Sequence, residues 1–469
     1  MRPETVLLAA CCALAACNHA PPYRQPELAV PEQFDAIGPA GSRPAAEIEW
    51  PSFFGDPQLR FLIAEALAHN RDLAASVARI EQARALYRIE DAARLPQVNA
   101  NAGASRTQAP LSSIDPELAN SSASVIFNQY TVQAAMASYE LDFWGRVRNL
   151  SEAARRRYLA TVEGDRAFRL SLIGNVAASY YAIRAGEEGI ALARDTVAAR
   201  QYALAIAKLR LDAGVTSTVD YDQSAILVAQ AQAQLADLQR STEQRRSQLL
   251  VLVGKPLAAS LPSARAIEDP GQFGELDAGL PSALLVNRPD VLQAEQQLRA
   301  ADADIGAARA AFFPRIALTG NLGFASAELG DLFKSSNQAW SVGGLVSLPI
   351  FDGGQRQAQL GVAQARRDEL VALYQRTVQT AFSEVSEALI GRRRLQEQIA
   401  VQVSAVEAQR RLAEVAELRY ENGISIYLEV VDARRSLFSA EQQLIQLRAS
   451  ALQNGVSLYV ALGGGPAGP

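Results

Sequence analysis

Histidine and cysteine are scarce in this chain of 469 residues, which holds two histidines and three cysteines. His19 lies in a proline-rich segment and His69 stands alone in a helical pattern, so neither has a partner for a metal site or a catalytic pair. The sequence also lacks a G-x-S-x-G elbow and a G-x-x-x-x-G-K-[ST] phosphate loop. These absences argue against an enzyme, and we expect no metal ion and no cofactor.

Basic residues do not gather into long runs, and the formal net charge is -5. Such a chain has no general attraction for phosphate backbones, so we expect no nucleic-acid partner. The two arginine triplets, 155–157 and 392–394, fall inside helical patterns, where charged runs are usually solvated faces.

Long apolar runs are also missing, because no stretch after the N-terminal region reaches the 18 or so residues of a membrane-spanning helix. The apolar run Val6–Leu14 is too short to span a bilayer. It follows Arg2 and leads to Leu14-Ala15-Ala16-Cys17, which looks like a bacterial lipoprotein signal. We therefore expect residues 1–16 to be a signal peptide and Cys17 to carry the lipid; an ordinary secretory peptide with an incidental cysteine is the alternative.

Removal of that signal would take Cys11 and Cys12 with it, leaving Cys17 as the one cysteine of the mature chain. An intramolecular disulfide is then impossible, and stability must come from packing. Asn18 is not the aspartate that resembles an inner-membrane retention signal, so sorting to the outer membrane is permitted.

Proline placement divides the rest of the chain. Residues 17–49 are proline-rich and predict an extended tether. Proline is absent between Pro116 and Pro256 and again between Pro349 and Pro466, which leaves room for two sets of long helices.

These two regions resemble each other. An offset of 209 carries Gly145, Gly214 and Gly254 onto glycines, and an offset of 218 carries Asp72 and Pro96 onto Asp290 and Pro314. The chain is therefore an internal duplication in which each half reads helix, two strands and a long helical hairpin. We place the first repeat at residues 50–258, a linker at 259–280, the second repeat at 281–465 and a short tail at 466–469.

Each predicted hairpin has a coiled-coil period. The 3,4-spaced seam of the first comprises Val228, Ala231, Leu235, Leu238, Thr242, Arg245, Leu249 and Leu252, and that of the second Leu437, Ala440, Leu444, Leu447, Ala451, Asn454, Leu458 and Ala461. The first arms, near 150–213 and 359–422, would be roughly 90 Å long at 1.5 Å per residue. Such helices must lie along others in a rod or tube, so we expect a mainly α fold with a small β part.

Four strand candidates precede the hairpins, at residues 97–108, 130–141, 316–324 and 340–350. Each is about ten residues long, which suits a membrane-spanning strand, although a half-exposed soluble sheet is the alternative. A lipid-exposed sheet must close, and single-chain barrels need at least about eight strands. Strands that span a membrane would therefore have to be pooled by several copies of the chain.

Four sequence motifs resemble the landmarks of outer-membrane efflux proteins, the TolC-like channels, and in particular their NodT-like lipoprotein branch. They are Tyr139-Glu140-Leu141-Asp142-Phe143-Trp144-Gly145-Arg146-Val147-Arg148, Asn287-Arg288-Pro289-Asp290, Phe313-Pro314 and Leu348-Pro349-Ile350-Phe351-Asp352-Gly353-Gly354. The resemblance implies a homotrimer with a twelve-stranded transmembrane β-barrel and a periplasmic α-barrel. It also implies a passive efflux duct for small molecules in the outer membrane of a Gram-negative bacterium, working with a periplasmic adaptor protein and an inner-membrane RND exporter.

The end of the second hairpin carries a charged stripe. Leu428, Asp432 and Arg435 share one helix face by i, i+4, i+7 spacing, with Glu429 beside them. Extending the seam backwards makes Val430 and Ala433 the packing positions, so the stripe should point away from the neighbouring helix. Ordinary surface pairs would show the same spacing.

By the resemblance, Leu428, Glu429, Asp432 and Arg435 match the family's periplasmic gate, and Asp220 and Tyr420 match positions that tie the coil shut. Two alternatives for the whole protein remain open at this point. One is a type I protein-secretion duct, which would share the fold, and the other is a periplasmic coiled-coil scaffold without a channel.

Overall fold

A computed structural model describes residues 18–28, 31, 48–110, 123–257, 260–274 and 284–464. The predicted signal peptide, Cys17 and the C-terminal tail lie outside these ranges. The chain divides into two compact units, one formed by Met1–Pro26, Ile80–Thr161 and Ala294–Leu373, the other by Glu27–Arg79, Val162–Gln293 and Tyr374–Pro469. Each unit contains segments from both predicted repeats.

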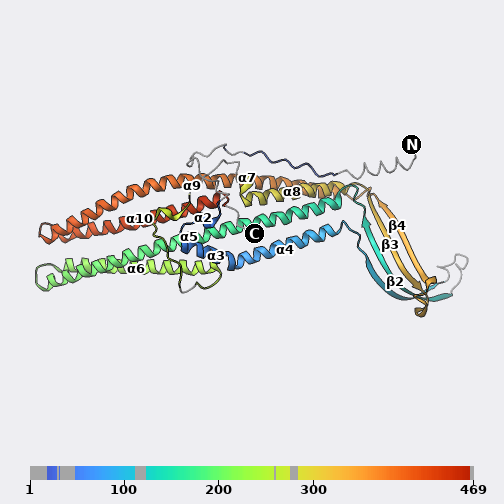
Figure 1. Cartoon of the computed structure of the whole chain (residues 1–469), viewed down its shortest axis with the longest axis horizontal. Helices are drawn as coiled ribbons and strands as arrows, with labels where there is room; N and C mark the ends of the chain where they lie inside the picture. The colour runs from blue at the N-terminus through green and yellow to red at the C-terminus, as the bar shows by residue number, and fades with distance from the viewer. Residues whose placement is uncertain are drawn as a thin grey trace. The chain divides into compact units, whose positions relative to one another are not determined.

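A four-stranded antiparallel sheet lies in the first unit (Figure 1). Its strands are β1 (Asn99–Pro110), β2 (Ser124–Glu140), β3 (Arg315–Ser326) and β4 (Gln338–Ser347), in the order β1-β2-β3-β4. All four predicted strands are confirmed. Strand β4 ends before the predicted residue 350, because Pro349 has no N–H for the ladder and the chain turns at Gly353 and Gly354, which have positive φ angles.

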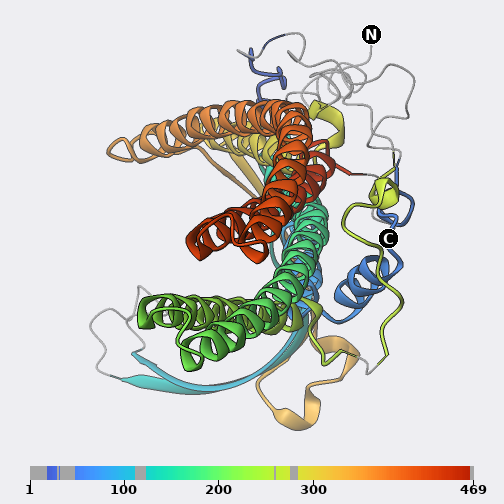
Figure 2. The same ribbon diagram turned by 90° about the vertical axis from the view of Figure 1, so that its left-hand side faces the viewer.

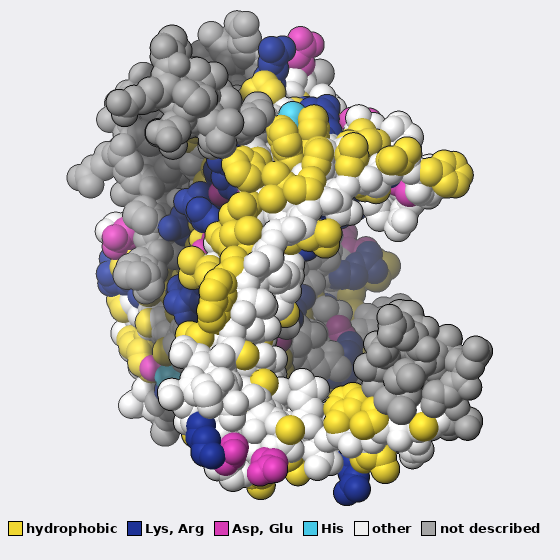
Figure 3. Space-filling model, turned by 90° about the vertical axis from the view of Figure 1, so that its right-hand side faces the viewer, with side chains coloured by type: hydrophobic (Ala, Val, Ile, Leu, Met, Phe, Trp, Pro, Cys, Tyr) yellow, Lys and Arg dark blue, Asp and Glu magenta, His cyan; other side chains and the backbone are white. Residues whose placement is uncertain are grey.

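The strand register separates two faces. Along β3, Ile316, Leu318 and Leu322 lie on one face and pair with Val346, Gly344 and Trp340 of β4. Every residue of β4 is exposed, as are all but one of β1. Figure 3 looks at the molecule from the side of the sheet and shows hydrophobic side chains in a band across it. The apolar alternation predicted from the sequence therefore corresponds to a real, exposed face.

The strand-to-helix motif that carried the family resemblance forms a tight junction after β2. Glu140 accepts two hydrogen bonds from the Arg146 guanidinium, at 2.8 and 2.7 Å, and the indole of Trp144 donates to the Pro314 carbonyl at 2.8 Å. Gly145 turns the chain with a φ of 78°. These contacts fix the point at which β2 ends and the next helix begins.

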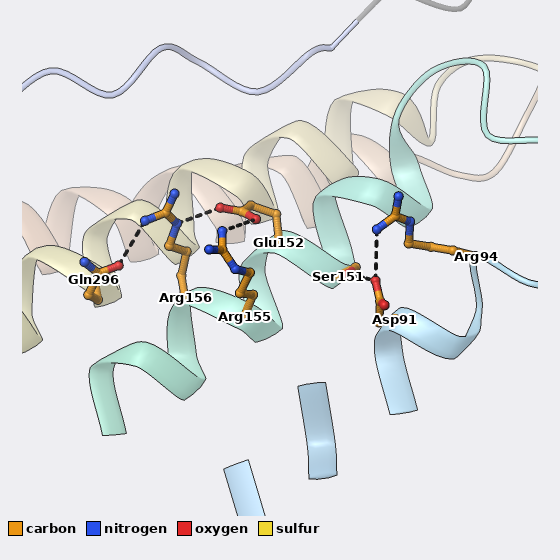
Figure 4. A network of polar contacts seen from close by, with 7 residues as sticks. All are labelled: Asp91, Arg94, Ser151, Glu152, Arg155, Arg156 and Gln296. Carbon is orange, nitrogen blue, oxygen red and sulfur yellow. Dashed lines mark hydrogen bonds and ion pairs between the residues drawn. The ribbon is translucent and has the colours of Figure 1, made fainter. Parts of the chain in front are cut away.

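Helices α4 (Arg71–Ala92), α5 (Arg146–Asp212) and α8 (Pro289–Ala310) contribute a polar network to the first unit (Figure 4). The Ser151 hydroxyl donates to Asp91 at 2.6 Å, and Arg94 donates to the same carboxylate at 3.1 Å. These bonds, the Ser151 one foremost, lower the pKa of Asp91. Arg156 adds a link from α5 to Gln296 of α8 at 3.2 Å.

The N-terminal residues 18–26 are non-helical, as their prolines predict, but they pack against the first unit. The His19 ring stacks on Phe313 with ring centres 4.5 Å apart, and Arg299 lies over the Tyr23 ring at 4.4 Å. Asn149 donates to the Asn18 side chain at 3.0 Å. This part of the predicted tether is therefore a docked segment, because its aromatic side chains find aromatic and cationic partners.

The second unit contains the short helices α2 (Trp50–Phe53), α3 (Pro57–His69), η4 (Pro270–Gln272) and α7 (Leu284–Asn287), and an aromatic core around Phe53 of α2. Phe53 stacks between Phe273 and Tyr459, with ring centres 5.1 and 4.4 Å away. The buried Asp56 caps α3 and accepts a hydrogen bond from Tyr180 at 2.8 Å. Burial and this carboxylate raise the pKa of Tyr180, so the phenol stays protonated.

Two helical hairpins, whose long first helices begin in the first unit, make up much of the second unit (Figure 1). The first consists of α5 and α6 (Thr218–Val253), the second of α9 (Gln355–Glu421) and α10 (Tyr427–Ala461). Both long first arms have 67 residues, which confirms the predicted lengths within a few residues. Among the described residues, no helix has the length and apolar character needed to cross a membrane.

Of the sixteen predicted seam positions, seven are buried, eight are half-buried and one is exposed. Buried members include Val228, Ala231 and Leu249 in the first hairpin and Leu444 and Leu458 in the second. The first seam is wrong at Arg245, which is exposed and donates from its guanidinium to the Ala182 carbonyl at 3.2 Å. A guanidinium can reach a carbonyl of the facing helix while its charge remains in water.

Candidate functional site

The turns of the two hairpins face the viewer in Figure 2 and have the same backbone geometry. Gly214 and Gly423 both adopt a φ of +71°, a left-handed conformation that glycine reaches without a steric penalty. The amide after each glycine bonds back to the carbonyl of an arginine, Val215 to Arg210 at 3.0 Å and Ile424 to Arg419 at 2.8 Å. The predicted glycine caps are therefore confirmed, and they position the first turns of α6 and α10.

The charged stripe of α10 lies on an exposed face. Val430 and Ala433 are buried, at 6% and 7% exposure, against Ala413 and Ala416 of α9. Leu428 is 45% exposed on the other side of the helix. The predicted division between packing positions and stripe is thus confirmed for this chain.

Two ion pairs hold the charges of the stripe. Asp432 and Arg435, one turn apart, approach to 3.1 Å with both side chains more than half exposed. Glu429 lies 3.9 Å from Arg419, across the turn on α9. Pairs this exposed are weak, so the arrangement can be broken without unfolding the hairpin.

Tyr420 links the two hairpins within the second unit. Its hydroxyl accepts a hydrogen bond from the Arg210 guanidinium of α5, and the Arg210 carbon Cζ lies 4.9 Å from the Tyr420 ring centre. Tyr420 also packs against Tyr427 of α10, with ring centres 5.2 Å apart. The Arg210 guanidinium therefore contacts Tyr420 of the second hairpin in two ways: it donates a hydrogen bond to the hydroxyl, and its charge lies near the ring.

Asp220 does not meet Tyr420 in the described chain. Its carboxylate accepts a hydrogen bond from Thr216, four residues earlier, and its backbone carbonyl accepts one from Ser224 at 2.9 Å. Asp220 thus closes the first turn of its own helix. The role expected for it in tying the coil shut has no counterpart among the contacts of a single copy.

Arg200 of α5 supplies a second contact between the hairpins, with Phe438 of α10. The Arg200 guanidinium donates to the Leu227 carbonyl at 2.8 Å and lies 6.0 Å from the Phe438 ring centre. Burial lowers the pKa of Arg200 and raises that of Tyr427. Both residues are half-buried, unlike the exposed stripe on α10.

Within the described ranges, no three histidine, cysteine, aspartate or glutamate side chains are grouped so as to hold a metal ion. The site consists instead of long helices ending in two turns, weak exposed ion pairs and links between hairpins.

The model of the family described as outer membrane efflux protein matches residues 62–255 and 280–464. The chain belongs to this family. It is an outer-membrane channel of the efflux-pump type in Gram-negative bacteria, with no enzymatic activity, and its two matched segments reflect the internal duplication. The scaffold alternative is therefore wrong.

Individual relatives agree over nearly the whole length. The solvent efflux pump outer membrane protein SrpC of Pseudomonas putida is 39% identical over 458 residues, covering 96% of each chain. Outer membrane protein OprJ of Pseudomonas aeruginosa is 38% identical, covering 96% of this chain and 94% of OprJ. The open state of the MtrE outer membrane channel of Neisseria gonorrhoeae matches with a TM-score of 0.87 and 36% identity, covering 96% of this chain and 98% of MtrE.

Sequence reasoning missed Arg200, Arg210 and Arg419 of this efflux channel. The internal repeat could have identified two of them, because the offset of 209 that matches the turn glycines also carries Arg210 onto Arg419. Arg200 had no such signal, since a lone arginine in a long helix usually lies on a solvated face.

Proposed function

We propose that three copies of this chain assemble into one efflux duct and pool their strands in a twelve-stranded membrane barrel. The observation that carries this proposal is the sheet, in which β1 and β4 each have a single neighbour in the described chain. Unpaired backbone groups are costly in lipid, and four strands are fewer than the roughly eight of the smallest barrels. A closed ring of several copies satisfies both edges of every sheet, and three is the number that the resemblance to TolC-like channels implies.

Light scattering of the purified protein, corrected for bound detergent, tests the assembly. Three chains per particle are expected. A stable monomer in mild detergent would contradict the proposal, because its sheet would then hold two open edges without a partner.

We also propose that the mature chain begins at Cys17 and carries acyl groups there. The lipoprotein-like signal that ends at Leu14-Ala15-Ala16-Cys17 supports this. Mass spectrometry of the N-terminal peptide is the test. An unmodified terminus elsewhere would refute the anchor while leaving the channel untouched.

The partners we propose are a periplasmic adaptor and an inner-membrane exporter of the RND class, which together hand small molecules to the duct. The name of the Pseudomonas putida relative supports organic solvents as one class of cargo. Expression in a solvent-sensitive strain that lacks only its outer-membrane pump component should restore tolerance. Growth that stays sensitive, with trimers present in the membrane, would argue for another cargo or another pump.

The gate we propose lies at the tip of the second hairpin. Leu428, Glu429, Asp432 and Arg435 of three copies would meet around the axis, because their face is exposed in one copy and points away from α9. Tyr420 would hold the tip closed through Arg210, and Asp220 through contacts that only neighbouring copies could supply. Exposed pairs are worth roughly 0.2 to 1 kcal/mol each, so a few per trimer suffice to bias a closed state.

A further inference from the structure

The two edges of the sheet carry exposed apolar side chains at corresponding ends. Just before β1, Val98 is 66% exposed, and just after β4, Ile350 and Phe351 are 93% and 90% exposed. Exposed apolar residues that are scattered singly over a surface need no explanation. Here, however, they flank β1 and β4, the two edge strands of the described sheet. What they contact depends on how a neighbouring copy aligns its edge strand.

The internal duplication extends to the strand register. Adding 218 to residues of β1 and 210 to residues of β2 converts the pair Asn99–Ala135 into Ala317–Leu345, which is a pair of the second strand hairpin. The same shifts convert Ala104–Tyr130 into Leu322–Trp340, another observed pair. From Asn99–Ala135 to Arg106–Asn128, the pairs of β1–β2 therefore have the same register as those of β3–β4.

Inside the chain, the seam between the two hairpins is β2–β3. It pairs Ala134 with Leu322 and Met136 with Gly320, and a bulge then shifts the register between Met136 and Tyr139. In a closed ring of repeated hairpins, the seam between copies, β4–β1, is the counterpart of this inner seam. The inner seam can therefore serve as the template for the outer one.

We infer that β4 pairs antiparallel with β1 of a neighbouring copy in one definite register. Val346 lies opposite Ala102, Gly344 opposite Ala104 and Ser341 opposite Thr107 of the neighbouring copy. This inference rests on the proposed trimer and adds to it the alignment of the strands.

The bulge provides an internal check. Beyond it, the offset between β2 and its counterpart becomes 209, because β2 has at the bulge one residue that the corresponding stretch of the β4 segment lacks. The Leu141 amide donates to the Ile316 carbonyl at 2.9 Å in the inner seam. In the seam between copies, the corresponding hydrogen bond runs from the Ile350 amide to the Val98 carbonyl of the neighbouring copy, in the same register as the pairs above. The most exposed apolar residues of the two edges thereby cover each other.

The faces of the strands also agree. In this register the apolar positions Val346 and Leu348 lie beside the small residues Ala102 and Ala100, on the face that carries Leu322 of β3. Ser341 and Thr107 fall together on the opposite face. A slip of one residue would move every side chain of the edge strand to the wrong face, so that alternative is strongly disfavoured.

Cysteine cross-linking of the full-length trimer tests the register. The expected pair is Ser341→Cys with Thr107→Cys, and the matched controls combine Ser341→Cys with Ser105→Cys or Ala109→Cys, which shift the register by two residues. Directly paired positions have their Cα atoms about 4.5–5.5 Å apart and disulfides form readily, whereas diagonal ones are about 7–8 Å apart. Single-cysteine variants control for bonds to Cys17.

Mild oxidation should yield covalent dimers and trimers for the Ser341/Thr107 pair, with about ten-fold less product for either control. Stronger cross-linking through Ser105 or Ala109, in particles that light scattering counts as trimers, would overturn the register while leaving the trimer intact. Intact trimers without cross-links from any pair would show that β4 and β1 do not meet in this way. Monomeric particles would instead refute the trimer itself.

Discussion

The two hairpin tips have the same backbone and different surfaces. Their turns share glycine φ angles and hydrogen-bond patterns, and the offset of 209 carries Arg210 onto Arg419. On the exposed face, however, Gln223 and Ile226 of the first hairpin correspond to Asp432 and Arg435 of the second. Only the second hairpin carries an opposite-charge pair there.

The shared arginine has also diverged in its partner. Arg419 stays within its own hairpin, 3.9 Å from Glu429, whereas Arg210 reaches across to the ring and hydroxyl of Tyr420. The internal duplication thus produced two turns with the same backbone, and side-chain changes then gave the two hairpins different contacts. In our account the second hairpin forms the constriction and the first holds it in place.

The largest effect is expected when the charged face of the second hairpin is removed. Three copies of an exposed pair total roughly 1 to 3 kcal/mol, which shifts a closed-to-open equilibrium about 5- to 150-fold. Asp432→Ala and Arg435→Ala should therefore raise single-channel conductance in planar bilayers. Gln223→Ala, at the matching position of the first hairpin, should conduct like the parent, as should Glu243→Gln, higher in that hairpin.

A smaller gain is expected from loosening the link between the hairpins. Arg210→Ala removes a hydrogen bond and a cation–π contact, and Tyr420→Phe removes only the hydrogen bond. Added to Asp432→Ala, the first change should raise conductance further, and the second should do so to a lesser degree. Arg419→Ala is the matched comparison, and an effect as large as that of Arg210→Ala would mean that the two arginines have not diverged.

Ion selectivity should change with the same stripe. A ring of carboxylates concentrates cations at a narrow opening, so neutralising Glu429 and Asp432 together with Glu429→Gln and Asp432→Asn should reduce cation preference. Reversal potentials in a salt gradient measure it, with Glu243→Gln as the control. Unchanged reversal potentials in conducting trimers would place the selective ring elsewhere.

The smallest expected effect is on thermal stability, and it compares a glutamate of the first repeat with the corresponding glutamate of the second. Burial, and then the nearby Glu268, raise the pKa of Glu188, while its counterpart Glu397 is paired with Arg394 at 2.7 Å in a largely exposed setting. A raised folded-state pKa means that the ionised form costs stability above the unfolded value of about 4.3 and that this cost vanishes below it.

Glu188→Gln should therefore raise the thermal midpoint by roughly 1–2 °C at neutral pH, with the gain disappearing as the pH falls through about 4. Glu397→Gln should bring no such gain. If the thermal midpoint rose equally at neutral pH and below a pH of about 4, improved packing, and not removal of the charge, would explain the gain.

Much of the fold could be predicted because its signals are long or repeated. Two proline-free regions and a heptad-like period predict helices of about the observed length, and the offset of 209 predicts a second copy of each turn. The strands were predicted from alternation, whose period survives even where every residue of β4 is exposed. These signals are local, so they do not depend on the arrangement of the elements.

The rest depends on contacts between distant segments. Arg210 meets Tyr420 across 210 positions of the chain, and His19 stacks on Phe313 from a segment whose prolines predict only an extended backbone. For Arg210 and His19, the residue type alone does not show whether the side chain contacts a partner or faces solvent. The seam failed at Arg245 for a related reason, because periodicity identifies a position on a helix and not the reach of a long side chain.

The central claim is that the exposed face of the second hairpin, not that of the first, meets its copies at the axis. Leu428→Cys tests it directly, with Val219→Cys as the matching position of the first hairpin; both parent side chains are exposed, at 45% and 57%. Mild oxidation of the closed trimer should join chains through residue 428, giving covalent dimers and a loss of conductance that reducing agent reverses. Equal or greater cross-linking through residue 219, or intact trimers whose 428 thiols never join, would contradict the account.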